Sequence, residues 1–459
     1  MNDEKMKMNK DESRERFEHL LEHARGAYSI PASAFDNYHV KRGLREADGS
    51  GVTAGVTKIG KAHGYVINEG EKTPVDGVLE YRGYNVSDLI NHAILEDRYG
   101  FEECIYLLFF GKLPTESQLE EFTGLLNEYR NLPARFTEDV IMKAPSRSIM
   151  NKMATSVLSL YSYDDRADDT SLENMLRQSM EIVARMPVIA AHAYAVYRNE
   201  FQGRSLHLIN PKNNLGTAQN FLRISRPDKS FTEEEARLLD MCLVIHAEHG
   251  GGNNSAFACR VLSSSGTDTY AALGAAIGAL KGPKHGGANI KVQEMFDCIK
   301  SKVSDTTNVD EVSCFLKRIL EGKEYDNGGL IYGMGHAVYT KSDPRTVMLK
   351  SYAKKFAYDR GFEKDYDLIE MVERISPDII NDYKGTHKDI CANVDLYSGL
   401  IYKMLNIPIE MYTPLFAIAR VAGWCAHRME ELCTSKRIIR PGYKCISSSE
   451  DYIELKDRK

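Results

Sequence analysis

The chain has 459 residues, of which 43% are hydrophobic and 27% are charged, and its formal net charge is −6. These proportions are ordinary for a globular protein, and the length alone predicts about three domains. The charge balance lacks the large positive excess with which nucleic-acid-binding proteins neutralise phosphates, so we expect no nucleic acid partner. The nine cysteines are scattered, without a CxxC pair that would indicate zinc or a redox motif, and this usage suits a reducing cytoplasm.

The N-terminal stretch MNDEKMKMNKDESRERFEHLLEHA lacks the apolar region of a secretory signal, and its acidic residues argue against a mitochondrial presequence. We expect a charged helix there. The longest weakly polar run, 270–281, is much shorter than the roughly 20 residues that cross a bilayer, so no membrane span is expected.

Strand signals are confined to about 56–86, where β-forming residues are interrupted by Gly, Pro and Asp, and this pattern predicts a small hairpin. Beyond it helical periodicity dominates, so the fold class is mainly α. Thr115 and Gln118 form a capping box ahead of a helix with an apolar face that extends to Tyr129. Further helical runs cover 172–197, 269–281, 288–301, 346–358, 396–405 and 412–432, and the polar stretches 163–172 and 301–311 are interpreted as loops.

A second capping box, Thr232 with Glu235, starts a helix whose apolar stripe continues to His249, which predicts that His249 faces the interior at the helix end. The segment HAEH (246–249) looks like a zinc site, but it fits neither HExxH nor HxxEH and has no third ligand nearby, so we expect no metal. Nucleotide loops are not indicated either, because GxxxxGK[ST] is missing and GMGHAV (333–338) lacks the final glycine of a dinucleotide loop.

Three glycines at helical spacing, Gly274, Gly278 and Gly282, stand among alanines. Small side chains let two backbones approach closely, so this face predicts a helix–helix or subunit contact.

The segment GPKHGGAN (282–289) places a histidine, His285, next to two glycines. A histidine without a motif is more often packed or solvated than functional. Further candidate functional residues follow along the chain: His336 and Arg345 in YGMGHAVYTKSDPR, Asp395 in NVDLYSGLIYKML, Arg420 in FAIARVAGW and Arg440 in RIIRPGY.

These segments, together with GVLEYRGYNVSDL, FFGKLPTESQLEEF and IHAEHGGGNNSAF, resemble the citrate synthases and their relatives the 2-methylcitrate synthases, in the same order and over nearly the whole chain. The resemblance implies a two-domain, nearly all-helical homodimer. Its large domain would be formed by 1–291 plus 403–459 and its small domain, with the CoA site and the catalytic Asp, by 292–402.

The same resemblance implies a role for each residue in joining acetyl-CoA to oxaloacetate. Asp395 would take the methyl proton of the thioester, His285 would donate a hydrogen bond to its carbonyl oxygen, and His336 would polarise the oxaloacetate ketone. Residues that would contact oxaloacetate are His246, His249, Arg345, Arg420 and Arg440, the last reaching the site of the opposite subunit. Lys341 and Lys388 are candidates for contacts with the CoA phosphates. Thr340 occupies a position where relatives often carry Arg or Lys. The resemblance implies no tightly bound cofactor.

Helix dipoles give an expectation for the charges of two of these groups. His285 precedes a predicted helix, whose N-terminal field disfavours imidazolium and favours a neutral donor. If Asn393 caps the next helix, the same field keeps Asp395 ionised. Three alternatives compete. A 2-methylcitrate synthase that takes propionyl-CoA would keep every catalytic residue, so this alternative stays open. A citrate-cleaving ATP enzyme would need an additional nucleotide module, for which there is no P-loop or spare length, and a non-catalytic member would be expected to have lost Asp395 or a histidine, neither of which is lost.

Overall fold

The computed structural model describes residues 14–21, 29–45, 51–69, 71–435 and 437–458. The chain divides into two compact units, one made of Met1–Ala54 with Arg440–Lys459 and the other of Gly55–Ile439. In the first unit, residues 14–21 are helical, as expected for the charged N-terminal stretch. Its remaining elements are α2 (Ala32–Asn37) and the short 3-10 helices η1 (Arg42–Leu44) and η5 (Leu455–Asp457).

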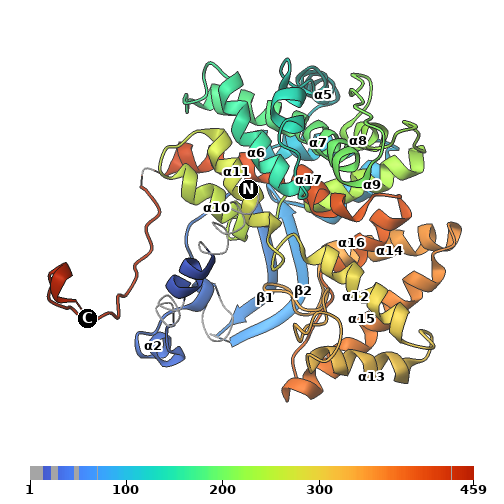
Figure 1. Cartoon of the computed structure of the whole chain (residues 1–459). Coiled ribbons are helices and arrows are strands. Elements are labelled where there is room, and N and C mark those ends of the chain that lie inside the picture. Colours follow the sequence, from blue (N-terminus) through green and yellow to red (C-terminus); the bar gives the residue numbers. More distant parts are fainter. Residues whose placement is uncertain (1–13, 22–28, 46–50, 70, 436, 459) are drawn as a thin grey trace, which may run out of the picture. The chain divides into compact units, whose positions relative to one another are not determined.

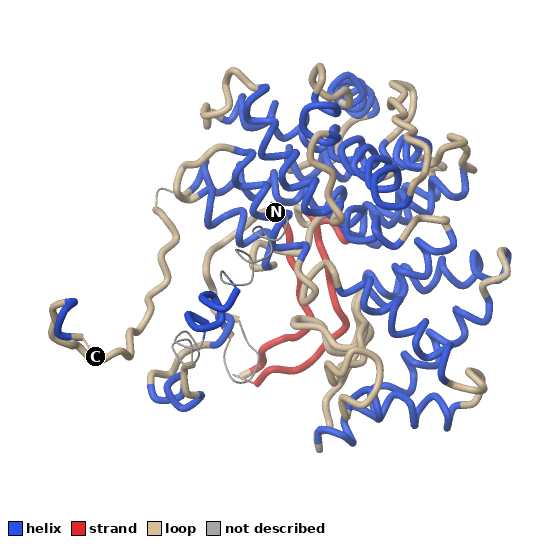
Figure 2. Tube along the Cα trace, in the orientation of Figure 1, coloured by secondary structure: helices blue, strands red, loops and turns tan. Residues whose placement is uncertain are grey.

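The second unit opens with the predicted hairpin. Strands β1 (Gly60–Asn68) and β2 (Glu71–Tyr81) pair antiparallel, and β3 (Tyr84–Asn85) adds a short third strand in the order β1-β2-β3. Figure 2 shows the two long strands side by side in a unit otherwise made of helices and loops. The mainly helical class with a small N-terminal hairpin is therefore confirmed.

The rest of the second unit is helical, apart from its loops. Its α-helices are α3 (Val86–Leu95), α4 (Phe101–Phe110), α5 (Glu116–Tyr129), α6 (Ile149–Leu160), α7 (Leu172–Gln202), α8 (Thr217–Ser225), α9 (Glu233–His246), α10 (Asn254–Ser263), α11 (Thr269–Lys281), α12 (Ala288–Lys302), α13 (Val309–Leu320), α14 (Pro344–Asp359), α15 (Glu363–Lys384), α16 (Asp395–Met404) and α17 (Tyr412–Thr434). The second unit also contains the short π-helix η2 (Thr137–Met142) and the 3-10 helices η3 (Tyr161–Tyr163) and η4 (Ile409–Met411). Among these described helices, none is long and apolar enough to traverse a bilayer.

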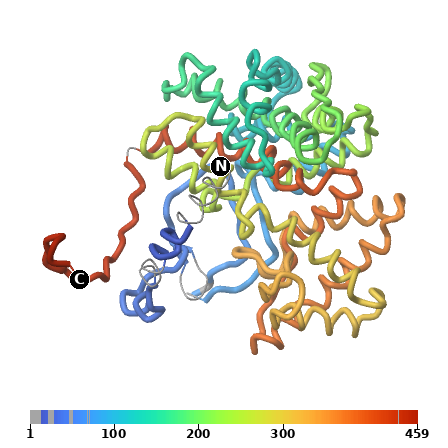
Figure 3. Tube along the Cα trace, viewed as in Figure 1, coloured from blue at the N-terminus to red at the C-terminus, as the bar shows by residue number. Residues whose placement is uncertain are grey.

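Helix α17 forms the centre of the core. It packs against α7, α9, α10 and α11, and its Trp424 is fully buried. In Figures 1 and 3 the chain from α12 to α16 forms one group of helices, and α17 then returns to the group that contains α7 and α11. The loops that connect the two groups therefore bring distant parts of the sequence together.

Most predicted helices begin and end within about two residues of their observed bounds, and both capping boxes are present. Three predictions need correction. Helix α7 continues to Gln202, beyond the predicted end at 197. Helix α9 ends at His246, not His249, because the hydroxyl of Tyr81 lies within 3.1 Å of the carbonyls of Val244, Ile245 and Glu248 and supports a turn there. The predicted loop 301–311 is shorter, because the side chain of Asn308 caps α13 at Val309.

The glycine face of α11 makes the predicted helix contact at one position of three. A Cβ on Gly274 would lie 3.0 Å from Cγ of Leu158, so this glycine lets α6 pack closely against α11. Gly278 has no atom within 4 Å of its hypothetical Cβ, and Gly282 meets only a carbonyl of its own turn among the described residues.

Candidate functional site

Two histidines mark the end of α9. His246 occupies the last helical position and His249 follows in the turn, and both are almost completely buried. The interior position predicted for His249 is confirmed. Burial, reinforced by the positive charges of Arg420 and Arg345, lowers the pKa of each ring well below the ordinary value, so both imidazoles are neutral.

His336 lies on the glycine-rich loop that precedes α14 in the chain. In space this loop contacts β1 and α16. Gly333 and Gly335 adopt φ values of +87° and +84°, which favour glycine, and a Cβ on Gly333 would lie 2.7 Å from Cδ1 of Leu396. The amides of Val338 and Tyr339 donate to Nδ1 of His336 at 3.0 and 3.2 Å. In the neutral ring the proton therefore stands on Nε2.

Arg345 stands beside that proton. Its terminal NH2 lies 3.3 Å from Nε2 of His336, and the His249 ring centre is 5.2 Å from that of His336. Asp343 caps α14 and accepts from Nε and NH2 of Arg345 at 2.9 and 2.6 Å. Although burial opposes the charge of Arg345, Asp343 raises its pKa. The Arg345 guanidinium, held by Asp343, thus stands against Nε2 of His336.

Asp395 begins α16, and Asn393 fixes its place. The Asn393 side chain accepts from the Asp395 amide at 3.1 Å and donates to the Gly335 carbonyl at 2.9 Å, so it joins the helix start to the His336 loop. Asn393 thus bonds the first amide of α16 as predicted, although Val394 occupies the cap position. The expected full ionisation of Asp395 is wrong, because burial outweighs the helix field and, with Asp343 nearby, raises its pKa to about 7.

His285 lies in the turn between α11 and α12, where its Nε2 is 3.0 Å from Oγ of Ser255. That hydroxyl also accepts from the indole N–H of Trp424 at 3.1 Å. Burial first, then the positive charges of Arg420 and Arg345, lower the pKa of His285 to about 4. The neutral charge predicted for His285 agrees with this lowered pKa, with burial as the main cause.

Arg420 projects from α17 and is fully buried. Its Nε donates to the His246 carbonyl at 2.5 Å, while its terminal nitrogens lack a partner within the described part of the chain. The same holds for further buried polar atoms of this site: both ring nitrogens of His246, Nε2 of His249 and Oδ1 of Asp395. Each such atom costs about 1–3 kcal/mol when unsatisfied, so the cluster indicates that a polar ligand supplies the missing partners.

The structure therefore brings together seven of the residues selected from the sequence, namely His246, His249, His285, His336, Arg345, Asp395 and Arg420. Asp343 and Ser255, which bond with Arg345 and His285, and the neighbouring Glu248 were not selected. Only Asp343 carries a local signal, because an Asp before a Pro is a typical helix start.

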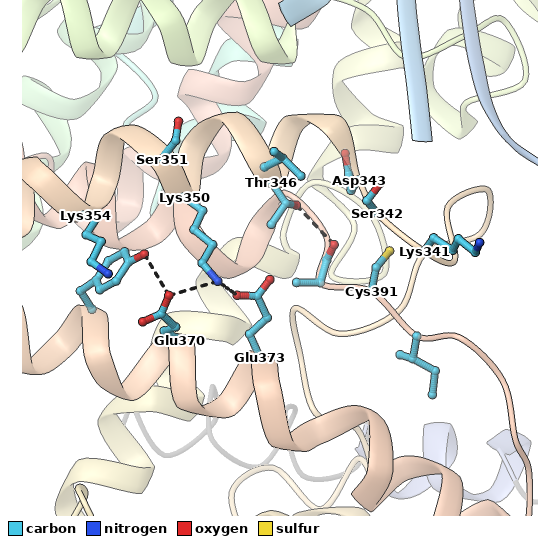
Figure 4. Close-up of a pocket in the computed structure, with 14 residues that line it drawn as sticks. Lys341, Ser342, Asp343, Thr346, Lys350, Ser351, Lys354, Glu370, Glu373 and Cys391 are labelled. Carbon is cyan, nitrogen blue, oxygen red and sulfur yellow. Dashed lines mark hydrogen bonds and ion pairs between the residues drawn. The ribbon is translucent and has the colours of Figure 1, made fainter. Parts of the chain in front are cut away.

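The two lysines selected for CoA lie in different surroundings. Lys341 lines a cavity of about 590 Å³ along α14 and α15, shown in Figure 4, in which Lys350 pairs with Glu370 and Glu373. Lys388 is exposed, and its backbone bonds with the side chain of Asn381. Arg440 belongs to the first unit of the chain.

A buried cluster of neutral histidines, arginines and a raised-pKa carboxyl, set in a helical fold, defines an enzyme site for a small anionic substrate. The family model of the citrate synthase C-terminal domain matches residues 49–442. The citrate synthase of Synechocystis sp. is 33% identical over 88% of this chain and 90% of its own, and that of Haloferax volcanii is 34% identical over 82% and 93%. The chain belongs to the citrate synthase family and is, with it, a transferase.

Solved structures agree with this assignment. The ternary complex of citrate synthase from Thermoplasma acidophilum with carboxymethyl coenzyme A and oxaloacetate aligns with a TM-score of 0.73 and 26% identity, over 91% of this chain and 99% of that one. Citrate synthase from Thermotoga maritima aligns with a TM-score of 0.70 and 30% identity, over 89% and 98%. The recognition of the family from its motifs is thereby confirmed.

Proposed function

We propose that the chain condenses acetyl-CoA with oxaloacetate and hydrolyses the resulting citryl-CoA to citrate and CoA, the reaction that opens the tricarboxylic acid cycle. The observation that carries this proposal is the buried cluster of unpartnered donors around Arg420, His246 and His249 beside the carboxyl of Asp395. A similar fold holds a CoA analogue and oxaloacetate together in the Thermoplasma acidophilum enzyme.

Oxaloacetate supplies what the donors lack, because it carries two carboxylates and a ketone. Guanidinium groups bind carboxylates in a fork geometry, so Arg345 and Arg420 hold the two charged ends, with Arg440 as a third contact. The neutral rings of His246 and His249 add hydrogen bonds without adding charge. The ketone oxygen accepts from Nε2 of His336, which Arg345 approaches at 3.3 Å.

Asp395 and His285 then act on the thioester. Asp395, with a pKa of about 7, takes the methyl proton, and neutral His285 donates a hydrogen bond to the thioester oxygen as the enol forms. The enol carbon attacks the ketone carbon of oxaloacetate, and His336 helps to protonate the new alkoxide. Water finally cleaves the thioester of citryl-CoA, which releases citrate and CoA.

The domain and subunit arrangement belongs to the same proposal. Residues 1–291 with 403–459 form the large domain and 292–402 the small one, and closure between them excludes water from the enol. Lys341 and Lys388 contact the CoA phosphates. The enzyme works as a homodimer, in which Arg440 completes the site of the opposite subunit, and it needs no tightly bound cofactor.

The test is release of the CoA thiol from purified protein. Release should require both oxaloacetate and acetyl-CoA and should be unchanged by a metal chelator. No release with any acyl-CoA contradicts the proposal. Running propionyl-CoA in parallel separates the 2-methylcitrate alternative, because one methylene in a pocket is worth about 1–3 kcal/mol of discrimination.

A further inference from the structure

Glu248 lies between His246, the last residue of α9, and His249, and the proposed reaction assigns it no part. Its side chain is fully buried. A Cβ on Gly423 would lie 2.3 Å from its Oε2, and a Cβ on Gly60 would lie 2.7 Å from its Cγ. The backbones of β1 and α17 thus fix where this carboxyl stands.

His427, which is bonded to Arg260, contacts that carboxyl. Arg260 donates to Nδ1 of His427 at 2.8 Å, and Nε2 of His427 lies 2.8 Å from Oε1 of Glu248. Because a guanidinium is always protonated and offers only donors, Nδ1 must be the acceptor, and the ring proton on Nε2 is donated to Glu248. Although burial opposes the charge, His427 and then Arg420 lower the pKa of Glu248.

Glu248 in turn offsets the charge of Arg420. Its Oε2 lies against Gly423, three residues after Arg420 on α17. Burial lowers the pKa of Arg420 to about 10, and Glu248 is the first of the charges that counteract this shift. Although Glu248 offsets the charge of Arg420, the two terminal nitrogens of Arg420 have no hydrogen-bond partner in the described part of the chain. Arg345 shows the usual arrangement, in which Asp343 binds one terminal nitrogen directly.

We propose that Glu248, held by His427 and Arg260, is a positioning residue for Arg420. It offsets the buried positive charge without occupying the terminal nitrogens, which therefore stay available for a carboxylate of the substrate. This inference rests on the proposed role of Arg420 in binding oxaloacetate.

The direct test is Glu248→Gln, which keeps the size of the side chain and an acceptor for His427 but removes the charge. We expect KM for oxaloacetate to rise at least about tenfold, while kcat and KM for the acyl-CoA stay within about threefold, as for loss of a binding interaction. The matched control is Glu431→Gln. It removes the same charge from the far end of the network, where Glu431 pairs with Arg260 at 2.7 Å.

The control variant should keep KM for oxaloacetate within about twofold of the wild type. Equal rises in the two variants indicate a merely structural network and overturn the proposal, as does an unchanged KM in Glu248→Gln. A wild type without any condensation activity overturns the proposed function instead, so the two failures are distinct.

Two variants of His427 keep the proposal testable if Glu248→Gln does not fold. The amide nitrogen of glutamine reaches the place of Nε2, whereas asparagine is too short to donate to Glu248. His427→Asn should therefore raise KM for oxaloacetate several-fold, and His427→Gln should stay near the wild type. Equal KM values for these two variants contradict the proposal.

Discussion

Burial moves the pKa values of Asp395 and His285 in opposite directions, because it penalises the charged form of each group. The pKa of Asp395 rises to about 7, and that of His285 falls to about 4. Above about pH 7 an ionised carboxylate therefore stands in one site with a neutral imidazole. Proton abstraction from a thioester needs this pairing of base and hydrogen-bond donor.

The first prediction is a pH profile. At low concentrations of both substrates, kcat/KM should rise about tenfold per pH unit below about pH 7 and level off above it, because Asp395 must lose its proton. His285, with a pKa of about 4, should give no limb near neutrality. Thiol release measured from pH 5 to 9, with unfolding monitored over the same range, checks this. A profile that is flat from pH 5 to 8 would contradict it.

The second prediction concerns stability. Since the pKa of Asp395 in the folded chain, about 7, exceeds the ordinary 3.8, folding favours the protonated form and stability is lost as pH rises between these values. Asp395→Asn should thus unfold at higher denaturant concentration at pH 8, with a gain of at most about 4 kcal/mol that shrinks by pH 5. Its turnover should fall by a factor of about 10² or more.

Asp164→Asn is the matched control for that stability measurement. Although burial opposes the charge of Asp164, hydrogen bonds from Gln178, Tyr270 and Arg177 lower its pKa to about 2. Its replacement should therefore destabilise the protein at pH 8. A loss of stability in both variants would show that the Asp395 carboxylate is not destabilising.

The side chains that touch substrate in the proposed reaction stand in short, recognisable motifs, and the sequence was sufficient to select them. Their partners were not predictable in the same way. Ser255 meets His285 and Glu248 meets His427 only through the folded chain, across 30 and 179 residues. The pKa of Asp395 was missed for a related reason, because its burial depends on segments far away in the sequence.

At the scale of elements, the hairpin supports the loop that carries His336. A Cβ on Gly64 would lie 2.6 Å from the Val338 carbonyl, and one on Gly77 would lie 2.3 Å from the Ser342 carbonyl. The Gly77 amide also donates to Oγ of Ser342 at 3.1 Å. The two strands therefore form a backing surface for the loop from His336 to Arg345.

The third prediction follows from this contact. Gly77→Ala must displace the loop, since backbone atoms cannot yield as a flexible side chain does, so we expect a loss of about 1–3 kcal/mol in stability and at least a tenfold loss of turnover. Thermal unfolding and thiol release measure the two effects. Gly124→Ala, in α5 with no atom within 4 Å, is the control and should be neutral or slightly stabilising. Wild-type turnover in Gly77→Ala would refute the role of the hairpin.

Helices were predictable where local signals define both ends. The capping boxes at Thr115 and Thr232 placed two helix starts correctly. The end of α9 was misplaced because its termination depends on Tyr81 from β2. No residue near the end of α9 in the sequence indicates that contact. Likewise, the cap at Asn308 lies inside a polar stretch that has the composition of a loop.

At the scale of the whole molecule, the site draws on segments from His246 to Arg420, so it exists only in the folded chain. Helix α17, which carries both Arg420 and the buried Trp424, links the site directly to the core. The proposed dimer extends this dependence to a second chain.

The fourth prediction tests that dimer. Asp395→Ala and Arg440→Ala chains, each weakly active or inactive alone, are mixed under conditions of subunit exchange. If Arg440 acts in the opposite subunit, one site of each heterodimer regains both intact residues, and thiol release should rise well above that of either parent. If Arg440 acts within its own chain, mixing restores nothing. A nearly wild-type Arg440→Ala parent would instead mark Arg440 as an ordinary surface charge.

The unpartnered polar atoms around Arg420 have a consequence for the life of the protein in the cell. A ligand that pairs these groups adds about 2.7 kcal/mol of stability at a hundred times its dissociation constant. Oxaloacetate would then protect the enzyme from unfolding and proteolysis. We expect the amount of folded enzyme to follow the supply of oxaloacetate. In starved cells, enzyme without bound substrate should be degraded first.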